Sequence, residues 1–148
     1  FRRVLFRSLK DLNMDAQDLK SAGLKVTLPR LKILEILEKS DNHHMSAEDI
    51  YRTLVMQGEE VGVATIYRVL TQFEEASMIN KLNFDNGQSV YELSNVEHHD
   101  HLLCVKCGKI DEFSDDVIEQ HQHDIATKYG YKLTDHCLYL YGLCKDCQ

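Results

Sequence analysis

Apolar residues recur at helical spacing through the first half of the chain and predict a series of helices. A short helix at residues 16–22 would end at Gly23, a residue that readily closes helices. A longer helix would begin after Thr27, a suitable N-cap, with Pro29 in its first turn, where a missing N–H costs little. Its apolar stripe consists of Leu31, Leu34 and Leu37.

Two further helices follow, and the second of them has the clearest buried face. Ser46 and Asp49 match a capping box and predict a helix that ends near Gly58. After a short connection, a helix at residues 64–76 carries apolar residues at positions i, i+3, i+4 and i+7. These residues are Ile66, Val69, Leu70 and Phe73.

The pattern then changes to the alternation of a β-hairpin. Leu82 and Phe84 alternate with polar residues, an Asp-Asn-Gly turn follows at 85–87, and residues 90–93 form the returning strand. Helices followed by a two-stranded hairpin are the layout of a winged helix-turn-helix domain, to which we assign residues 14–94. The helix at 64–76 would then be the recognition helix, and the hairpin would be the wing.

The second half of the chain, residues 95–148, has strand-like runs on both sides of one helix. Residues 101–105 and 109–113 predict two strands, Ser114 would cap the helix, and residues 131–141 predict a long alternating strand. This small unit has little core of its own, so we expect it to pair with a second copy in a homodimer. The predicted fold class is α+β, with an N-terminal winged helix-turn-helix domain and a C-terminal α/β dimerisation domain.

The first 13 residues differ in character from the rest. The numbering opens on Phe1, and Met14 stands directly before the first helix-like segment. We interpret residues 1–13 as an expression leader. The alternative is an incomplete native arm whose basic residues could touch DNA phosphates.

The net charge of −7 argues against a broadly basic nucleic-acid-binding surface. Any contact with DNA must therefore come from a local patch. On the predicted recognition helix, the polar face opposite the buried stripe consists of Thr65, Arg68 and Gln72, with Tyr67 and Thr71 beside them. A second small basic cluster consists of Lys25, Arg30 and Lys32. The alternative for both is an ordinary solvated surface.

No run of about 18 apolar residues is present, and no segment has the features of a secretory signal. We therefore expect a cytoplasmic protein with no membrane partner.

Four of the five cysteines form two Cys-x-x-Cys pairs, Cys104 with Cys107 and Cys144 with Cys147. Each pair can turn two thiolates onto one ion, and two pairs complete a tetrahedral zinc site. The alternatives are a redox pair or unrelated thiols, but redox motifs of the thioredoxin type occur singly, so the doubled pattern favours structural zinc. Cys137 lies in a strand-like run and is predicted to be a small core residue.

A cluster of histidines is the second chemical feature. His98, His99, Asp100 and His101 follow one another. In an extended run His99 and His101 point to one side while His98 and Asp100 point to the other, so one segment can serve two metal ions. Donors of this kind, without thiolate, suit Fe(II), Mn(II), Co(II) or Zn(II). The alternative is a polar surface loop.

These motifs together resemble the ferric uptake regulator family. The resemblance lies in 23–30 (Gly-Leu-Lys-Val-Thr-Leu-Pro-Arg), 41–49, 64–70 (Ala-Thr-Ile-Tyr-Arg-Val-Leu), 98–101 and 104–108, and it runs from Gly23 to Cys147 in one order. It implies a winged-helix domain joined to a dimerisation domain, in an Fe(II)-responsive repressor of iron-acquisition genes. The implied partners are AT-rich inverted repeats in double-stranded operator DNA and further copies of the chain, as a dimer or a tetramer.

The resemblance also implies roles for individual residues. Structural zinc would be held by Cys104, Cys107, Cys144 and Cys147. A regulatory Fe(II), for which Mn(II), Co(II) or Zn(II) can substitute, would be held between the domains by His44, Glu92, His99, His101 and Glu112. An additional metal site within the dimerisation domain would consist of His98, Asp100, Glu119 and His136. DNA would be contacted by Lys25, Thr65, Tyr67 and Arg68.

Three other functions compete with this hypothesis. Within the family, a Mn(II)-responsive or peroxide-responsive regulator is similar, although peroxide sensors carry aspartates where this chain has Glu92 and Glu112. A small zinc metalloenzyme would use the histidine cluster to activate water, but no His-Glu-x-x-His motif is present and the helical half would have no role. A zinc-ribbon interaction module would leave the histidines without a function. We therefore expect a regulator and not an enzyme.

Overall fold

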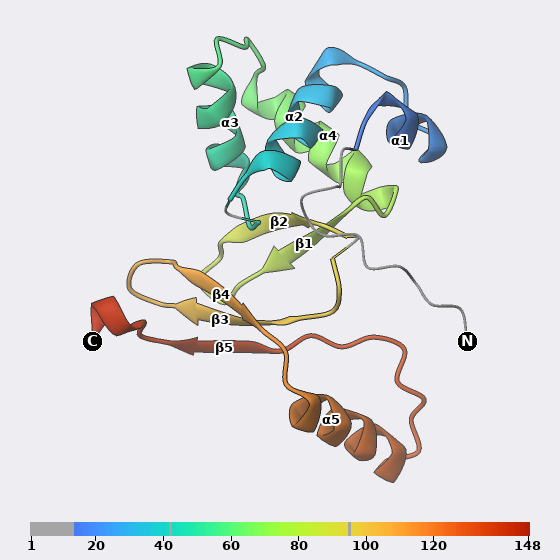
Figure 1. The fold of residues 1–148 in the computed structure, drawn as a ribbon, viewed down its shortest axis with the longest axis vertical. Helices are drawn as coiled ribbons and strands as arrows, with labels where there is room; N and C mark the ends of the chain where they lie inside the picture. The colour runs from blue at the N-terminus through green and yellow to red at the C-terminus, as the bar shows by residue number, and fades with distance from the viewer. Residues whose placement is uncertain (1–13, 42, 95) are drawn as a thin grey trace. The chain divides into compact units, whose positions relative to one another are not determined.

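The computed structural model describes residues 14–41, 43–94 and 96–148, and its contacts divide the chain into two compact units, Phe1–Val96 and Glu97–Gln148. The interpretation of residues 1–13 as a leader lies outside the described residues. The N-terminal unit contains α1 (Ala16–Ser21), α2 (Leu28–Lys39), α3 (Ala47–Met56), α4 (Val63–Glu75), β1 (Ile79–Asn83) and β2 (Ser89–Leu93) (Figure 1). The C-terminal unit contains β3 (Asp100–Cys104), β4 (Ile110–Phe113), α5 (Asp116–Lys128), β5 (Tyr139–Gly142) and the short 3-10 helix η2 (Lys145–Cys147).

The side-chain helix caps predicted for the N-terminal unit are present at α3 but not at α2. The capping box at α3 is present as predicted, because the Ser46 hydroxyl accepts from the Asp49 N–H and the Asp49 carboxylate accepts from the Ser46 N–H. Thr27 is the N-cap of α2, but its side chain makes no capping hydrogen bond. Gly23 follows α1 with a φ of 76°, a left-handed conformation that favours glycine.

The helices pack around a continuous apolar core. The stripe predicted for α4 is buried in full, and it meets the inward faces of α2 and α3. The fully buried members with the largest side chains include Phe73, Leu19, Ile33, Leu34, Ile50, Leu54, Ile66 and Leu70. Helix periodicity predicted Leu34, Ile66, Leu70 and Phe73 among these residues, whereas Leu19 and Ile33 were not predicted.

A two-stranded hairpin follows the helices and completes the winged-helix arrangement. β1 and β2 pair antiparallel from Ile79 opposite Leu93 to Asn83 opposite Ser89. Gly87 in the turn has a φ of 80°, which the predicted Asp-Asn-Gly sequence accommodates. Met45, just before α3, forms a single antiparallel bridge to Tyr91 and so ties the helices to the hairpin. The predicted α+β fold class is confirmed.

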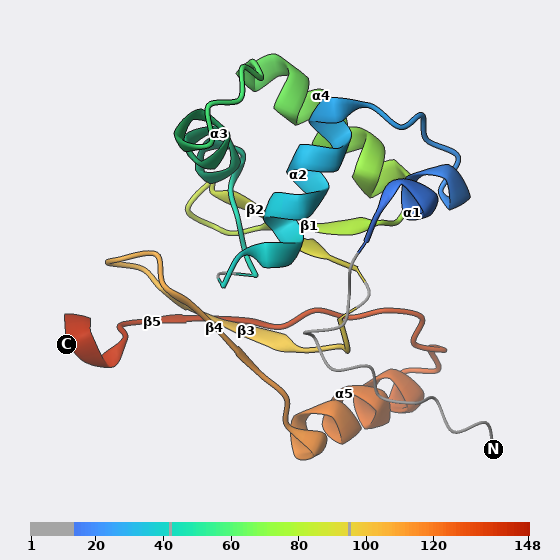
Figure 2. The same ribbon diagram turned by 45° about the horizontal axis from the view of Figure 1, so that its top comes forward.

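The C-terminal unit is a three-stranded sheet with one helix. The strand order is β4-β3-β5, with β3 antiparallel to β4 and parallel to β5. α5 connects β4 to the segment that leads into β5, and none of its residues is buried (Figure 2). The unit has only two buried apolar residues among those described, Leu103 and Cys104.

Three predictions for this unit are wrong. The strand expected at 131–141 is present only as Tyr139–Gly142. The neighbouring strand β3 pairs with this segment only from Tyr139 onward. α5 is capped by Asp115 and not by Ser114, since the Asp115 carboxylate accepts from two N–H groups of the first turn. Cys137 is exposed and is no core residue, because the strand that would have buried it is absent there.

Among the described residues, no helix has both the length and the apolar character needed to cross a bilayer.

Candidate metal centres and DNA-binding surface

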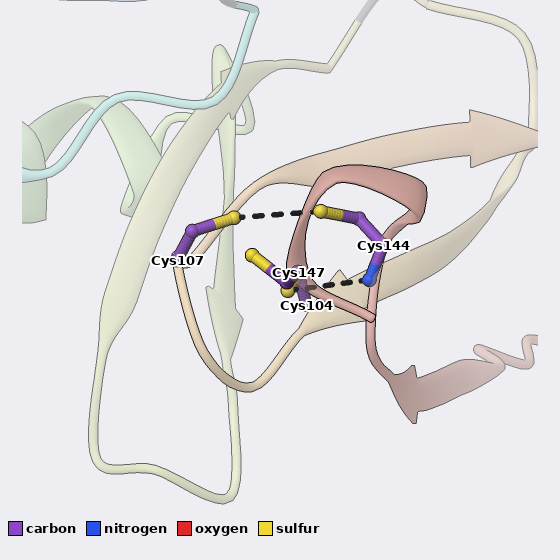
Figure 3. A group of neighbouring side chains, drawn as sticks. All are labelled: Cys104, Cys107, Cys144 and Cys147. Atoms are coloured by element: carbon purple, nitrogen blue, oxygen red, sulfur yellow. Dashed lines mark hydrogen bonds between the residues drawn. The ribbon is translucent and has the colours of Figure 1, made fainter.

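The four paired cysteines converge in the C-terminal unit. Cys104 ends β3, and Cys107 lies in the turn to β4, which Gly108 closes with a φ of 76°. Cys144 and Cys147 belong to the last turn of the chain around η2. Their four sulfur atoms all lie within 4.8 Å of one another (Figure 3).

The spacing of the sulfur atoms fits a tetrahedral ion. The Sγ atoms of Cys107 and Cys144 are 3.8 Å apart. A regular tetrahedron with zinc–sulfur bonds of about 2.3 Å has edges of about 3.8 Å. The donor set and the geometry therefore both suit zinc, and the terminal position of Cys147 does not remove it from the group.

The thiols of this group ionise unequally. Hydrogen bonds from the backbone N–H groups of Cys144 and Cys107 lower the pKa of the Cys104 thiol to about 6. Hydrogen bonding to the sulfur of Cys144 and to its other neighbours raises the pKa of Cys147 to about 12. The first thiolate thus forms readily, whereas the last proton leaves only when a cation compensates the accumulating negative charge.

A second group in the same unit consists of histidine and carboxylate. His98 Nε2 lies 3.2 Å from Glu119 Oε1, and His136 Nε2 lies 2.9 Å from Glu119 Oε2. Asp100 is fully buried, 3.6 Å from His98 Nε2, and neither of its oxygens has a hydrogen-bond partner among the described residues. A buried carboxylate without donors is costly unless a cation is close, so the group fits a divalent ion. It unites the four residues predicted for the additional site.

The opposite side of the same segment carries another set of donors. The rings of His99 and His101 are 4.7 Å apart, and His99 Nε2 faces Glu112 Oε1 at 3.7 Å. The Glu97 carbonyl lies 2.8 Å from His99 Nδ1 and can only accept, so it places the proton of a neutral ring on Nδ1. The lone pair of Nε2 then points toward a carboxylate, an arrangement that a bound cation would stabilise.

The N-terminal unit contributes a separate buried pair. His44 Nε2 lies 3.1 Å from Glu92 Oε2, and both side chains are buried. The Asn80 amide donates to Glu92 Oε1 over 3.3 Å, from the position directly opposite Glu92 in the hairpin. Asn80 was not predicted, although the register of the two strands places its amide opposite the candidate ligand Glu92.

The polar face of α4 is partly exposed and partly engaged. Arg68 and Tyr67 are exposed, Tyr67 by 44%, whereas Thr65 is half-buried. The Tyr67 hydroxyl donates to Glu48 Oε1 over 2.9 Å, beside a hollow of about 490 Å³ between the start of α3 and the hairpin. Lys25 is exposed in the connection from α1 to α2.

In the predicted basic cluster of Lys25, Arg30 and Lys32, two of the three side chains are engaged by other groups of the protein. Lys32 lies 3.1 Å from Glu59, and this hydrogen bond raises the pKa of Lys32. Arg30 donates to the Lys25 carbonyl over 2.6 Å and to Gln72 Oε1 over 2.7 Å. Gln72, predicted to belong to the DNA-reading face, is therefore occupied within the protein.

The chain is similar over most of its length to known proteins of one family. The family model described as "Ferric uptake regulator family" matches residues 21–141. The chain is similar to the ferric uptake regulation protein of Legionella pneumophila, at 58% identity over 90% of this chain and 98% of that one. It is also similar to the crystal structure of the Vibrio cholerae ferric uptake regulator, with a TM-score of 0.83 and 58% identity over 87% of this chain and 98% of that one. The structure of the Pseudomonas aeruginosa ferric uptake regulator with manganese matches with a TM-score of 0.77 and 48% identity, over 90% and 99% of the two chains.

Proposed function

This chain belongs to the ferric uptake regulator family, and on that premise we propose that it is an Fe(II)-dependent repressor of iron-acquisition genes. It binds AT-rich inverted repeats in operator DNA as a cytoplasmic homodimer. The observation that carries the proposal is that each unit presents part of a hard donor set. The N-terminal unit offers His44 with Glu92, and the C-terminal unit offers His99 with its neighbours.

The regulatory ion would act by joining the two units. His44 and Glu92 from the DNA-binding unit, together with the C-terminal donors His99, His101 and Glu112, form a nitrogen and oxygen set that suits Fe(II) and its substitutes. One ion held by both units would fix their relative orientation. In a dimer it would thereby fix the spacing of the two recognition helices, which must match successive turns of DNA. The structure of the Pseudomonas aeruginosa relative is with manganese, which supports the binding of a divalent ion by this chain.

Each remaining group of residues has a separate role in this proposal. The four cysteines hold a structural zinc, which contributes folding free energy to a unit with little core. The cluster around Asp100 and Glu119 holds an additional divalent ion. α4 enters the major groove with Thr65, Tyr67 and Arg68, and Lys25 reaches an adjacent minor groove.

Dimerisation would use the C-terminal unit. Its exposed apolar side chains include Leu102, Val105, Val117, Ile125, Tyr129, Tyr131, Leu140, Tyr141 and Leu143. A domain of this size gains stability when such a surface is covered, and a second copy is the partner that symmetry makes simplest.

The test is operator binding with and without metal. Mn(II) serves as an air-stable substitute for Fe(II), and the wild-type protein should retard an AT-rich inverted repeat only when Mn(II) is present. Glu92→Ala should flatten this metal response while zinc content and dimerisation stay as in the wild type. Glu60→Ala, which removes an exposed carboxylate between α3 and α4, is the matched control and should respond normally.

Two results would overturn the proposal. Retardation that is equal with and without metal would remove the regulatory role of the ion. Metal-dependent hydrolysis of a substrate without DNA binding would instead favour the small zinc enzyme. Iron remains the proposed signal over peroxide because Glu92 and Glu112 stand where the related peroxide sensors carry aspartates.

A further inference from the structure

Arg30 connects two segments that the proposed function assigns to different grooves of DNA. It lies in the first turn of α2, and one guanidinium nitrogen donates to the carbonyl of Lys25, 2.6 Å away. The other terminal nitrogen donates to the side-chain oxygen of Gln72 in α4, 2.7 Å away and 42 positions along the chain. A planar guanidinium is a rigid fork of donors and holds two such acceptors in a fixed geometry, whereas the donors of a lysine radiate from a single atom on a flexible stem.

The segment that carries Lys25 has few other attachments. Lys25 and Val26 make no backbone–backbone hydrogen bond with any other described residue. Thr27, which follows them, makes no side-chain capping bond to α2. On either side, Leu24 donates to the Leu19 carbonyl and the Thr27 carbonyl accepts from Leu31. Between these points, the bond from Arg30 is the polar contact of the Lys25 backbone with other described residues.

Gln72 links this attachment to the DNA-reading face. Thr65, Arg68 and Gln72 are spaced by three and four residues and form one row along α4. Gln72 is half-buried at the end of this row that is nearer the C-terminus of the helix, where its oxygen is engaged by Arg30. Through Arg30, Gln72 thus fixes where Lys25 lies relative to α4, the helix that carries Arg68.

From these contacts we infer that Arg30 and Gln72 are positioning residues for operator recognition: they set the offset between Lys25 and the reading face of α4. This inference rests on the proposed function. A protein that reads a major groove and the adjacent minor groove needs its two reading elements at a fixed separation, because ordering a loose segment on binding lowers the affinity. Arg30 fixes that separation in the protein without DNA.

Gln72→Met is the most informative variant, since it removes the acceptor while keeping length, helix propensity and charge. Operator affinity should fall on the order of tenfold through lost pre-organisation. The salt dependence should also weaken by about one unit of slope per protomer, because Lys25 no longer engages its groove. Gln57→Met, at the exposed C-cap of α3, is the matched control and should change neither quantity.

Coupling to Lys25 distinguishes positioning from a merely structural contact. Lys25→Ala should weaken binding in the wild type but have little further effect in Gln72→Met, as residues acting through one another are not additive. Additive losses with an unchanged salt slope would overturn the proposal. The proposal would also be overturned if Arg30→Gln lowered the salt slope of operator binding and Gln72→Met did not. Arg30 would then contact a DNA phosphate itself. If the wild type bound no operator at all, the proposed function would fail, whereas normal binding by Gln72→Met would refute only this inference.

Discussion

The two units of this protein are stabilised by different means. In the N-terminal unit, the four helices α1 to α4 and a hairpin bury a continuous set of large apolar side chains, among them Phe73, Ile50 and Leu70. In the C-terminal unit, α5 buries no residue, and the buried positions are shared between Leu103, Cys104 and the polar residues Asp100 and His101. The first unit has an ordinary hydrophobic core, whereas the buried positions of the second include candidate metal ligands.

This difference indicates that the two units depend on ligands to different degrees. A unit that folds by burying apolar surface keeps its shape without ligands and can present a rigid DNA-reading face. A unit of some fifty residues with little apolar burial needs cations or a partner for stability, so its structure can respond to metal. The predictions below change one unit at a time.

Loss of the zinc ligands should have the largest effect, and it should be confined to the C-terminal unit. Structural zinc contributes about 10–16 kcal/mol in small zinc-finger peptides. Cys107→Ser should therefore lose one tightly held zinc per chain and the hydrogen-exchange protection of β3 to β5, together with the dimer. Cys137→Ser, at an exposed thiol outside the group, is the matched control. A Cys107→Ser protein that keeps its zinc and its protected sheet would contradict the assignment.

Truncation of a core side chain should destabilise the N-terminal unit and leave the C-terminal unit unaffected. Phe73 is fully buried in the N-terminal unit, and Phe73→Ala should lower the free energy of unfolding of that unit by about 3–5 kcal/mol. Zinc content should be unchanged. Ile125→Ala on α5, where the side chain is 57% exposed, should cost far less in a thermal unfolding measurement on the protein at low concentration. Equal losses for the two substitutions would remove the contrast between the units.

Dimerisation should depend on the exposed apolar surface of the C-terminal unit. Leu140 in β5 is 41% exposed, and Leu140→Asp should weaken the dimer by about 1–3 kcal/mol if a partner covers it. Sedimentation equilibrium measures this loss. Val55→Asp, at a comparably exposed site on α3, should leave the dimer intact. A dimer that tolerates Leu140→Asp would place the interface elsewhere.

The smallest effect concerns the helix caps of the N-terminal unit. Ser46 completes a capping box, and Ser46→Ala should destabilise the unit by about 1 kcal/mol in chemical denaturation. Thr27 occupies the same position at α2 without a capping bond, so Thr27→Ala should cost only a few tenths of that. If the two substitutions cost the same, the hydroxyl of Ser46 contributes little.

The comparison of the units also explains which features the sequence predicts. The helices and the hairpin were predictable because a hydrophobic core imposes a period on the sequence, as in the row from Ile66 to Phe73. The strand at 131–141 was predicted too long because alternation cannot reveal whether a partner strand exists, and only Tyr139–Gly142 lies beside β3. Side-chain chemistry identified the cysteine group directly, since thiolate pairs need few structural assumptions.

The two polar contacts that were not predicted differ in how far the sequence contains them. The Asn80–Glu92 pair follows from the register of the predicted hairpin. The Arg30–Gln72 bond leaves no periodic signal, because it depends on how two helices pack in space. Residues that position others are for this reason harder to recognise from sequence than residues that bind an ion themselves.

If one metal ion couples the two units to operator binding, as proposed, the coupling between metal and DNA must be reciprocal. The Mn(II) affinity of the zinc-loaded dimer should be measured by titration calorimetry with and without saturating operator DNA. Linkage requires that DNA raise the metal affinity by the same factor by which metal raises the DNA affinity, typically about 5–150-fold. We predict such a factor for the wild type and its loss in His101→Ala. Equal Mn(II) affinity with and without operator would mean that the bound ion does not control operator binding.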